Sequence, residues 1–327
     1  MRIAILSSAR RCQTSYDVAY SFGGKMNEML QETGFIRFFD NHYNYTTLSE
    51  ADTVFLPFCF FTDATSRINS SDRVYTSWSK AYALMNDARI VLEVENILRM
   101  SKQCLLISPH QLLQPTWKTP LRFCRVLLLD KIMAGATQDV VIPYSILKNK
   151  VIRSTLRTNL IYGAGKNKWY GMFGGMRKRI FESLAHLKRK DVNVSTSRSY
   201  EAYRNGFAQS RFCIIIPGDT MSTSMLSRSI LSGCVPIIVA NEFRDLPFAR
   251  ILNYSSFSIL LHIHATKHYS WARHLIRNIE SIDYRLYYQN VINVQDYFDY
   301  EKFTNISPYH AALHAITYDI ENSLSFE

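Results

Sequence analysis

Short apolar runs alternate with longer amphipathic stretches along almost the whole chain, and this alternation constrains the fold more than any other feature. Apolar runs bounded by turn residues are typical of buried strands, and segments with helical apolar spacing between them predict βα units that build a parallel sheet. The sequence therefore predicts the α/β class rather than a sandwich or a bundle. The predicted strands are 3–6, 36–39, 53–58, 104–108, 126–129, 140–142, 159–162, 192–194, 212–216, 235–239 and 257–261, and the predicted helices are 16–32, 74–100, 176–187, 200–209, 224–232, 271–279 and 308–323.

The chain has 327 residues, which exceeds the usual length of one domain, so we expect two domains. The segment 147–157 is basic, shows no clear period and follows Pro143, and is therefore the expected connection. The sequence predicts an amino-terminal domain over 1–147, a second domain over 148–307 and a carboxyl-terminal helix over 308–327.

The formal net charge of +11 favours acidic partners, which include nucleic acids, nucleotide diphosphates and anionic membrane surfaces. The signs of a nucleic-acid-binding protein are clustered Lys and Arg interleaved with exposed aromatic residues in a recognised module. The sequence lacks such a module, and most aromatic residues lie in apolar-periodic segments. We therefore expect no nucleic-acid partner.

The six cysteines show no CxxC or Cys/His spacing typical of a metal site, and most of them lie inside apolar runs. This pattern predicts buried free thiols. The cysteines are Cys12, Cys59, Cys104, Cys124, Cys213 and Cys234.

The amino terminus, MRIAILSSARR, has only four consecutive apolar residues, too few for a signal-peptide core or a membrane span. We expect no transmembrane segment and, for a complete chain, a cytoplasmic location.

The segment 210–248 carries the clearest functional pattern. It predicts a buried strand, a Pro-Gly turn, a Ser/Thr-rich helix start, a helix, a glycine stop and a second buried strand. In open α/β sheets ligands bind at the carboxyl ends of strands, and a helix amino terminus offers N–H groups to phosphate. Alternatively, Asp219, Ser222 and Ser224 only cap the helix. No GxGxxG or P-loop spacing supports a dinucleotide fold or an ATPase.

This segment resembles the exostosin-like glycosyltransferases, glycosyltransferase family 47. Their shared block has a strand, a Gly-Asp turn, a Ser-rich helix start, an apolar helix, a Gly-Cys pair and a downstream Leu-Pro-Phe. The matching residues are Ser210, Phe212, Cys213, Pro217, Gly218, Asp219, Thr220, Ser222, Leu226, Ile230, Gly233, Cys234, Pro236, Leu246, Pro247 and Phe248. Segments 49–61, 138–145 and 153–179 are also similar to the family, so the resemblance covers roughly 16–280.

The resemblance implies a GT-B fold with two Rossmann-like domains facing across a cleft. It implies transfer of a hexosyl or pentosyl group, with inversion, from a nucleotide sugar, usually a UDP-sugar, to a hydroxyl of a glycan or glycoprotein acceptor. It also implies no cofactor beyond this co-substrate and no obligatory metal, because helix termini and basic side chains neutralise the departing diphosphate. For location, it offers the Golgi lumen as the alternative to the cytoplasm.

The resemblance also identifies the expected site residues. The expected donor-binding residues are Gly163, Arg177, Pro217, Gly218, Asp219, Thr220, Ser222, Ser224, Arg228, Gly233, Pro236, Asn241 and Glu242. The general base has to reach the acceptor from the amino-terminal domain, and His110 and Asp63 both follow apparent strands there. Each of these two could instead be an ordinary hydrogen-bonding residue of a loop.

Four positions depart from the family pattern. Arg228 occupies the place of an acidic residue in the helix of the donor block, and Asn241, next to Glu242, replaces another acid. Gln111 replaces an aspartate, and His264 stands where a glutamate is expected. The alternative function is therefore a catalytically inactive, exostosin-like protein that binds a sugar or a nucleotide.

Overall fold

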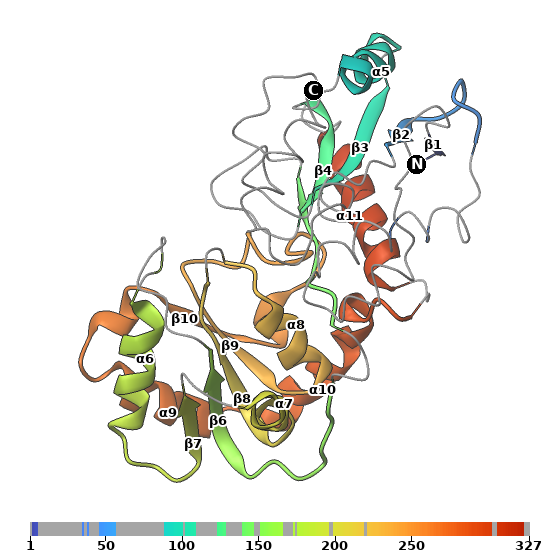
Figure 1. Ribbon diagram of the computed structural model, residues 1–327. Coiled ribbons are helices and arrows are strands. Elements are labelled where there is room, and N and C mark those ends of the chain that lie inside the picture. The colour runs from blue at the N-terminus through green and yellow to red at the C-terminus, as the bar shows by residue number, and fades with distance from the viewer. Residues whose placement is uncertain are drawn as a thin grey trace. The chain divides into compact units, whose positions relative to one another are not determined.

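The protein forms two compact units, residues 1–145 with 309–327 and residues 146–308 (Figure 1). The computed structural model describes residues 2–5, 35, 38, 46–56, 88–100, 102–108, 123–128, 139–146, 151–165, 173, 175–195, 199–218, 221–302 and 306–323. Each unit contains a five-stranded sheet whose paired strands are all parallel. The predicted α/β class is confirmed, and each unit has the type of sheet that a GT-B protein requires.

The sheet of the first unit has its strands in sequence order, β1-β2-β3-β4-β5. Its described elements are β1 (Ile3–Ile5), β2 (Thr53–Phe55), α5 (Ala88–Arg99), β3 (Gln103–Ser108), β4 (Arg125–Leu128) and β5 (Val140–Val141). Val54, Leu105 and Leu127 are fully buried, as expected for a parallel sheet that is covered on both faces. The strand predicted over 36–39 is wrong at Phe38, which is helical.

The carboxyl-terminal helix α11 (Pro308–Ser323) belongs to this first unit. The ring of Tyr309 stacks on Phe38 and meets Phe35 edge-on, with ring centroids 4.9 and 5.0 Å apart. The guanidinium of Arg125 also donates a hydrogen bond to the carbonyl of Ile316. The predicted helix is therefore present, and its packing makes it an integral part of the first unit.

The sheet of the second unit has the order β10-β9-β8-β6-β7. Its elements are β6 (Asn159–Ala164), α6 (Met176–Ala185), β7 (Val192–Ser195), α7 (Tyr200–Ala208), β8 (Ser210–Ile215), α8 (Ser224–Leu231), β9 (Val235–Ala240), η4 (Tyr254–Ser256), β10 (Ile259–His262), η5 (Ala265–Lys267), α9 (Trp271–Ser281), α10 (Tyr284–Val294) and η6 (Gln295–Phe298). Every predicted strand and helix of this unit is present, whereas α10 was not predicted. Among the helices described in either unit, none is both long enough and apolar enough to cross a membrane.

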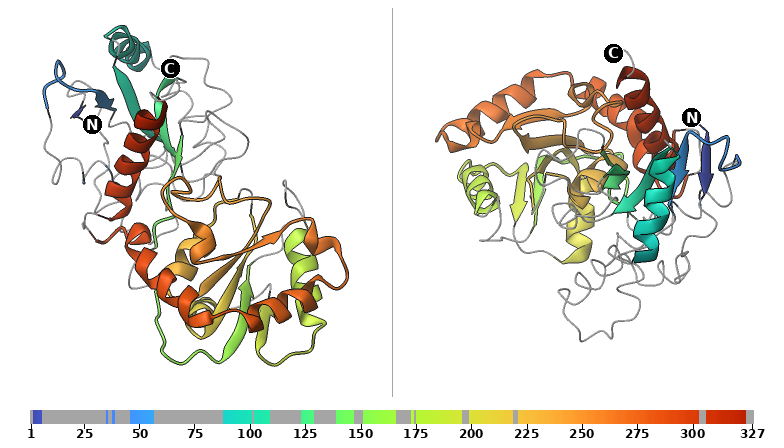
Figure 2. Two further views of the ribbon diagram at one scale, coloured as in Figure 1. Left: turned by 180° about the vertical axis from the view of Figure 1, so that it is seen from behind. Right: turned by 90° about the horizontal axis from the view of Figure 1, so that it is seen from above.

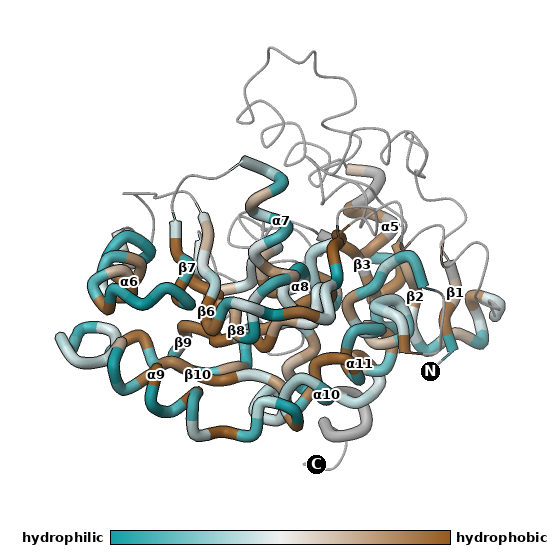
Figure 3. The backbone as a smooth tube through the Cα atoms, turned by 90° about the horizontal axis from the view of Figure 1, so that it is seen from below, coloured by the Kyte–Doolittle hydropathy of each residue, from teal (hydrophilic) through white to brown (hydrophobic). Residues whose placement is uncertain are grey.

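Helices cover both faces of this second sheet (Figure 2), and Figure 3 shows its apolar central strands between them. Helices α6 and α9 share one face, where Arg189 after α6 forms a 2.8 Å ion pair with Glu280 of α9. Helices α7 and α8 lie on the other face (Figure 3). This distribution follows from the chain path, because β6 connects to β7 on one side and the chain then returns to β8 on the other side of β6.

The prediction of buried free thiols is wrong for four cysteines. Cys104 is bonded to Cys124 and Cys213 to Cys234, with Cα atoms 4.7 and 5.8 Å apart. In each pair one cysteine lies in a strand and the other directly precedes the next strand of the same sheet. A βαβ crossover brings residues about twenty positions apart side by side, which a search for short Cys spacings does not detect. Cys12 and Cys59 lie outside the described residues.

Candidate functional site

The second sheet has a topological switch point between β6 and β8. The connection from β6 leads to β7 on one side, and every later connection leads toward β10 on the other side. Ligands of open α/β sheets bind outside the carboxyl ends of the strands at such a point, because the crossover helices diverge there to opposite faces. The carboxyl edge beside Ala164 and Ile216 is therefore the candidate site.

Arg177 spans this switch point. It lies in the first turn of α6, and its Nη2 donates to the carbonyl oxygen of Ile216 at 3.3 Å and to that of Pro217 at 3.5 Å. These carbonyls follow β8, so one guanidinium bridges from α6 to the end of the neighbouring strand. The structure thus brings together Arg177 and Pro217, two of the predicted donor-binding residues.

Gly165 makes this position of Arg177 possible. A Cβ atom at Gly165 would lie only 3.0 to 3.2 Å from the guanidinium atoms of Arg177, and its φ of +150° disfavours any other residue. Sequence reasoning missed Gly165, because the predicted strand ended at residue 162 and Gly163 was the glycine directly after it, whereas β6 extends to Ala164. Gly163, which was predicted to bind the donor, lies inside β6, where a Cβ would lie 2.8 Å from the ring of Phe181. The structure gives Gly163 a packing role.

Helix α8 starts at the same edge of the sheet. Its N-cap is Thr223, whose side chain accepts a hydrogen bond from the backbone N–H of Met225 at 3.0 Å. The N-cap of α8 is therefore not one of the three residues that the sequence suggested as caps. Ser222 is buried and precedes the N-cap, and Ser224 is the first residue of the helix. Gly218 has open space where a side chain would be. Asp219 and Thr220 lie outside the described residues.

Arg228 and Tyr203 meet on the face of the sheet that α7 and α8 cover. Arg228 is 8% exposed, and its guanidinium lies over the ring of Tyr203, 5.3 Å from the centroid. Burial raises the pKa of the Tyr203 hydroxyl, and the charge and hydrogen bonding of Arg228 and the charge of Arg177 oppose this rise. Sequence reasoning missed Tyr203, because an aromatic residue at helical spacing is typical of a core position.

Two predicted donor-binding residues lie at the opposite edge. Gly233 and Pro236 occur at the amino end of β9, whereas Thr223 and Pro217 lie at the carboxyl edge. Gly233 has a φ of +72°, which suits a helix stop, and a Cβ there would lie 2.8 Å from Nη2 of Arg157. We assign both residues structural roles.

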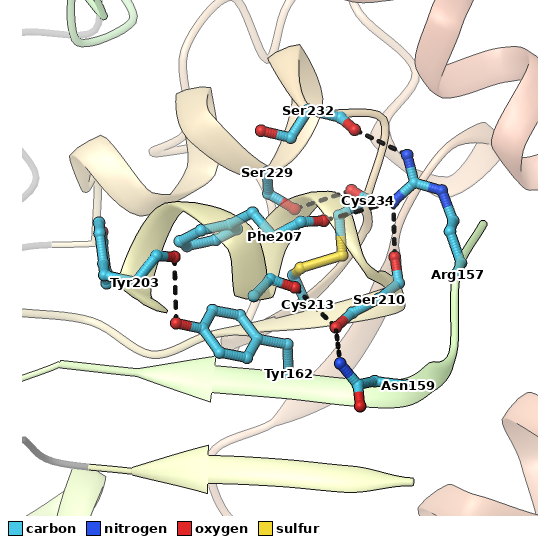
Figure 4. The surroundings of a disulfide bond; sticks show 11 residues. Arg157, Asn159, Tyr162, Tyr203, Phe207, Ser210, Cys213, Ser229, Ser232 and Cys234 are labelled. Atoms are coloured by element: carbon cyan, nitrogen blue, oxygen red, sulfur yellow. Dashed lines mark hydrogen bonds between the residues drawn. A yellow bond between two sulfur atoms is a disulfide. The ribbon is translucent and has the colours of Figure 1, made fainter. Parts of the chain in front are cut away.

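The amino edge is closed by hydrogen bonds within the protein (Figure 4). Arg157 donates to the carbonyls of Phe207, Ser210 and Ser232 at 3.3, 2.7 and 2.7 Å. The hydroxyl of Ser229 donates to the carbonyl of Cys234 at 2.7 Å, next to the disulfide. Backbone carbonyls at this edge are thus satisfied from within the chain.

The remaining predicted residues are dispersed. Asn241 and Glu242 follow β9 at the carboxyl edge and are exposed, and Glu242 forms a 2.6 Å ion pair with Arg244. His264, one of the positions that depart from the family pattern, follows β10 and is also exposed. His110, Asp63 and Gln111 lie outside the described residues, so their expected roles stay predictions.

Comparison with known families supports the resemblance read from the sequence. Residues 127–273 match the model of the Exostosin GT47 domain. Among curated relatives, "Probable arabinosyltransferase ARAD1" of Arabidopsis thaliana is 32% identical over 171 residues, which are 50% of this chain and 37% of that protein. "Probable glycosyltransferase At3g07620" of the same plant is 28% identical over 42% of this chain and 28% of its own length. The exostosin-like resemblance is confirmed over this stretch.

A rice relative, "Probable glucuronosyltransferase Os03g0107900" of Oryza sativa subsp. japonica, is 30% identical over 32% of this chain and 19% of its own length. The chain thus spans well under half the length of these curated relatives. Among solved structures, the calicheamicin glycosyltransferase CalG4 aligns at a TM-score of 0.35 and 10% identity, over 95% of this chain and 79% of its own. MurG of Acinetobacter baumannii aligns at a TM-score of 0.38 and 8% identity, over 89% of this chain and 77% of its own. At these values, the fold assignment rests on the sheets of the protein itself.

Proposed function

We propose that the protein is an inverting glycosyltransferase that moves a sugar from a nucleotide sugar, a UDP-sugar first among the candidates, to a hydroxyl of a glycan. The exostosin match over residues 127–273 supports the transferase class. The observation that carries the proposal is the position of Arg177 across the β6/β8 switch point, beside the amino terminus of α8. A cation and the positive dipole of a helix amino terminus at this edge are complementary to a diphosphate.

In the proposed reaction the acceptor oxygen attacks the anomeric carbon while the bond from that carbon to the diphosphate oxygen breaks. The diphosphate leaves with the bonding electrons, and a general base takes the hydroxyl proton. Arg177 and the helix terminus stabilise the charge that develops on the leaving diphosphate, which is the role that a metal ion has in other folds. This proposal requires no bound metal.

His110 and Asp63 are the two proposed bases, and alanine substitutions at these positions are expected to have different effects on kcat. If His110 is the base, His110→Ala lowers kcat by about 10² to 10⁴-fold with little effect on UDP affinity, and Asp63→Ala is mild. The ascending limb of the kcat profile then lies near pH ~6 to 7, whereas a carboxylate base moves it to about 4 to 5. Activity within a few-fold of wild type in both variants excludes both.

The first experiment is a thermal unfolding screen with UDP, GDP and CDP at millimolar concentration, with and without EDTA. We expect UDP to raise the melting temperature, because a ligand at ~100 times its Kd stabilises the native state by about 2.7 kcal/mol. No shift with any nucleotide contradicts the donor site. Loss of the shift in EDTA contradicts the metal-independent mechanism. Hydrolysis of individual UDP-sugars by the purified protein then separates an active transferase from the inactive binding homologue.

The two disulfides support a location in an oxidising compartment, because such bonds are rare in reducing cytosol. We therefore propose the lumen of the secretory pathway, the alternative location expected from the resemblance, over the cytoplasm. Alkylation of the protein unfolded in denaturant without reductant, followed by peptide mass spectrometry, tests this directly. Recovery of Cys213 and Cys234 as alkylated free thiols from the source cells counts against a lumenal location.

A further inference from the structure

The hydroxyl of Tyr203 occupies a distinctive electrostatic position at the carboxyl edge. Tyr203 lies in the first turn of α7, on the face shared with α8, and is partly exposed. Arg228 lies against its ring, and Arg177 is close enough for its charge to act on the hydroxyl. Two helices, α6 and α8, therefore each contribute one arginine, Arg177 and Arg228, whose charge acts on the hydroxyl of Tyr203 in α7.

Tyr203 is held firmly in this place. The hydroxyl of Tyr162 in β6 donates to the backbone carbonyl of Tyr203 at 3.1 Å, which ties the start of α7 to the sheet (Figure 4). Gly206 permits this close approach, because a Cβ there would lie 2.1 Å from the Tyr162 ring. The ring of Tyr203 also meets Phe207 edge-on at 5.2 Å. A fixed ring makes its hydroxyl a preorganised group.

The direction of the hydroxyl proton follows from the chemistry of arginine. A guanidinium has only donors, so the oxygen of Tyr203 can accept from a neighbouring arginine but cannot donate to it. Its own proton is therefore directed away from both cations. Two positive charges and one O–H donor around a common point are complementary to a polyoxyanion, and diphosphate is the anion that the proposed reaction releases.

We propose that Tyr203 is a donor-binding residue that donates a hydrogen bond to the diphosphate of the nucleotide sugar, beside Arg177 and Arg228. This inference rests on the proposed function and adds a residue to it. Because burial raises the pKa of the hydroxyl, Tyr203 remains protonated, and so remains a donor, throughout the neutral range. Tyr203 takes no part in proton transfer.

The test compares Tyr203→Phe with Tyr284→Phe in the full chain. Tyr284 is a matched control, because burial also raises its pKa and two arginines, Arg157 and Arg211, act on it, but it contacts Phe212 toward the amino end of the sheet. Each variant keeps its ring. We expect Tyr203→Phe to weaken UDP binding about 10- to 150-fold, the size of one hydrogen bond to a charged group, and Tyr284→Phe to change it less than twofold.

Uridine, which lacks phosphate, separates a lost phosphate contact from a distorted site. Ligand-observed NMR at millimolar concentration should give the same uridine affinity for wild type and Tyr203→Phe. Equal UDP affinity in wild type and Tyr203→Phe overturns the inference. An equal loss of affinity for uridine and for UDP in Tyr203→Phe also overturns it, as does an equal loss of UDP affinity in Tyr203→Phe and Tyr284→Phe. If wild type binds UDP and Tyr203→Phe binds it equally well, only this inference fails. If wild type binds no nucleoside diphosphate, the proposed function fails as well.

Discussion

The two edges of the second sheet share the same kinds of residues, an arginine over a glycine and a tyrosine near two arginines, but these residues make different contacts at each edge. At the amino edge Arg157 lies over Gly233, and the charges of Arg157 and Arg211 act on Tyr284. At the carboxyl edge Arg177 lies over Gly165, and the charges of Arg177 and Arg228 act on Tyr203. Both glycines have positive φ.

The difference lies in the hydrogen bonds of the two arginines. Arg157 makes two bonds of 2.7 Å and one of 3.3 Å to backbone carbonyls and lies over the ring of Tyr288. Arg177 makes longer bonds, of 3.3 and 3.5 Å. The amino edge also carries the ends of α7 and α8, whereas the carboxyl edge carries the start of α8, with its positive dipole. Similar residues therefore stabilise the fold at the amino edge, and at the carboxyl edge they form the proposed ligand site.

The largest expected effect is on activity at the carboxyl edge. Arg177→Met should lower kcat/KM by about 10² to 10³-fold, because it removes charge stabilisation of the leaving diphosphate, while the melting temperature changes little. Arg211→Met is the matched control at the amino edge, because Arg211 is exposed and lies over Tyr284. Steady-state kinetics on both variants test the comparison. Wild-type activity in Arg177→Met would contradict the proposed role of Arg177 and of the carboxyl edge in donor binding.

The next largest effect is on stability at the amino edge. Arg157→Met should lower the free energy of unfolding by about 2 to 3 kcal/mol, since three backbone carbonyls lose a charged donor. Urea unfolding measures this loss. UDP affinity of the folded variant should equal that of wild type. A weaker UDP affinity without any change in stability would reverse the roles assigned to the two edges.

A smaller effect is expected from alanine at the two glycines. Gly233→Ala should cost about 1 to 3 kcal/mol of stability, because its φ is +72° and Arg157 has to move. Gly165→Ala combines a φ of +150° with displacement of Arg177, so it should also weaken UDP binding by roughly tenfold, about 1.4 kcal/mol. Thermal unfolding and UDP titration of both variants give the two readouts. Equal UDP affinity in the two variants would show that the position of Arg177 is unimportant.

The smallest effect is a dependence on alkaline pH that the two edges share. The folded-state pKa of Tyr203 and that of Tyr284 are raised by burial, so above pH ~10 the unfolded chain loses these protons first. Each tyrosine therefore contributes a loss of stability as the pH rises from about 10 through its folded-state pKa. Urea unfolding at pH 9 and pH 11 should show a smaller loss in Tyr203→Phe and in Tyr284→Phe than in wild type. If one variant loses as much stability between pH 9 and pH 11 as wild type, the hydroxyl of that tyrosine is accessible to water in the folded wild-type protein.

Much of the fold was predictable because the relevant signals are local. Apolar runs such as 235–239 are too short and too apolar for surface helices, and they form buried strands. The stop of α8 was predictable from Gly233, since only glycine readily takes the left-handed conformation that follows a helix. Helix α10 was missed, because its helical segment follows α9 after only two residues and few of its side chains are buried.

The candidate site was predictable only in part. The block 210–248 forms the predicted strand, helix and second strand, but its residues divide between two edges, since a strand and the helix after it run in opposite directions through the layer. Pro217 and Ser224 therefore share an edge, and Gly233 and Pro236 occupy the other. Linear order along a motif carries no information on this division.

The sequence by itself determined the α/β class, the order of the strands and helices of the second unit other than α10, and the exostosin-like character of residues 127–273. Only the tertiary structure decided which distant residues meet: Cys213 with Cys234, Arg177 with Gly165, and Tyr203 with Arg228. The physical reason is that periodicity and propensity act over one or two turns of chain. Contacts at the edge of a parallel sheet instead depend on strand order and crossover direction, which are set by packing of the whole unit.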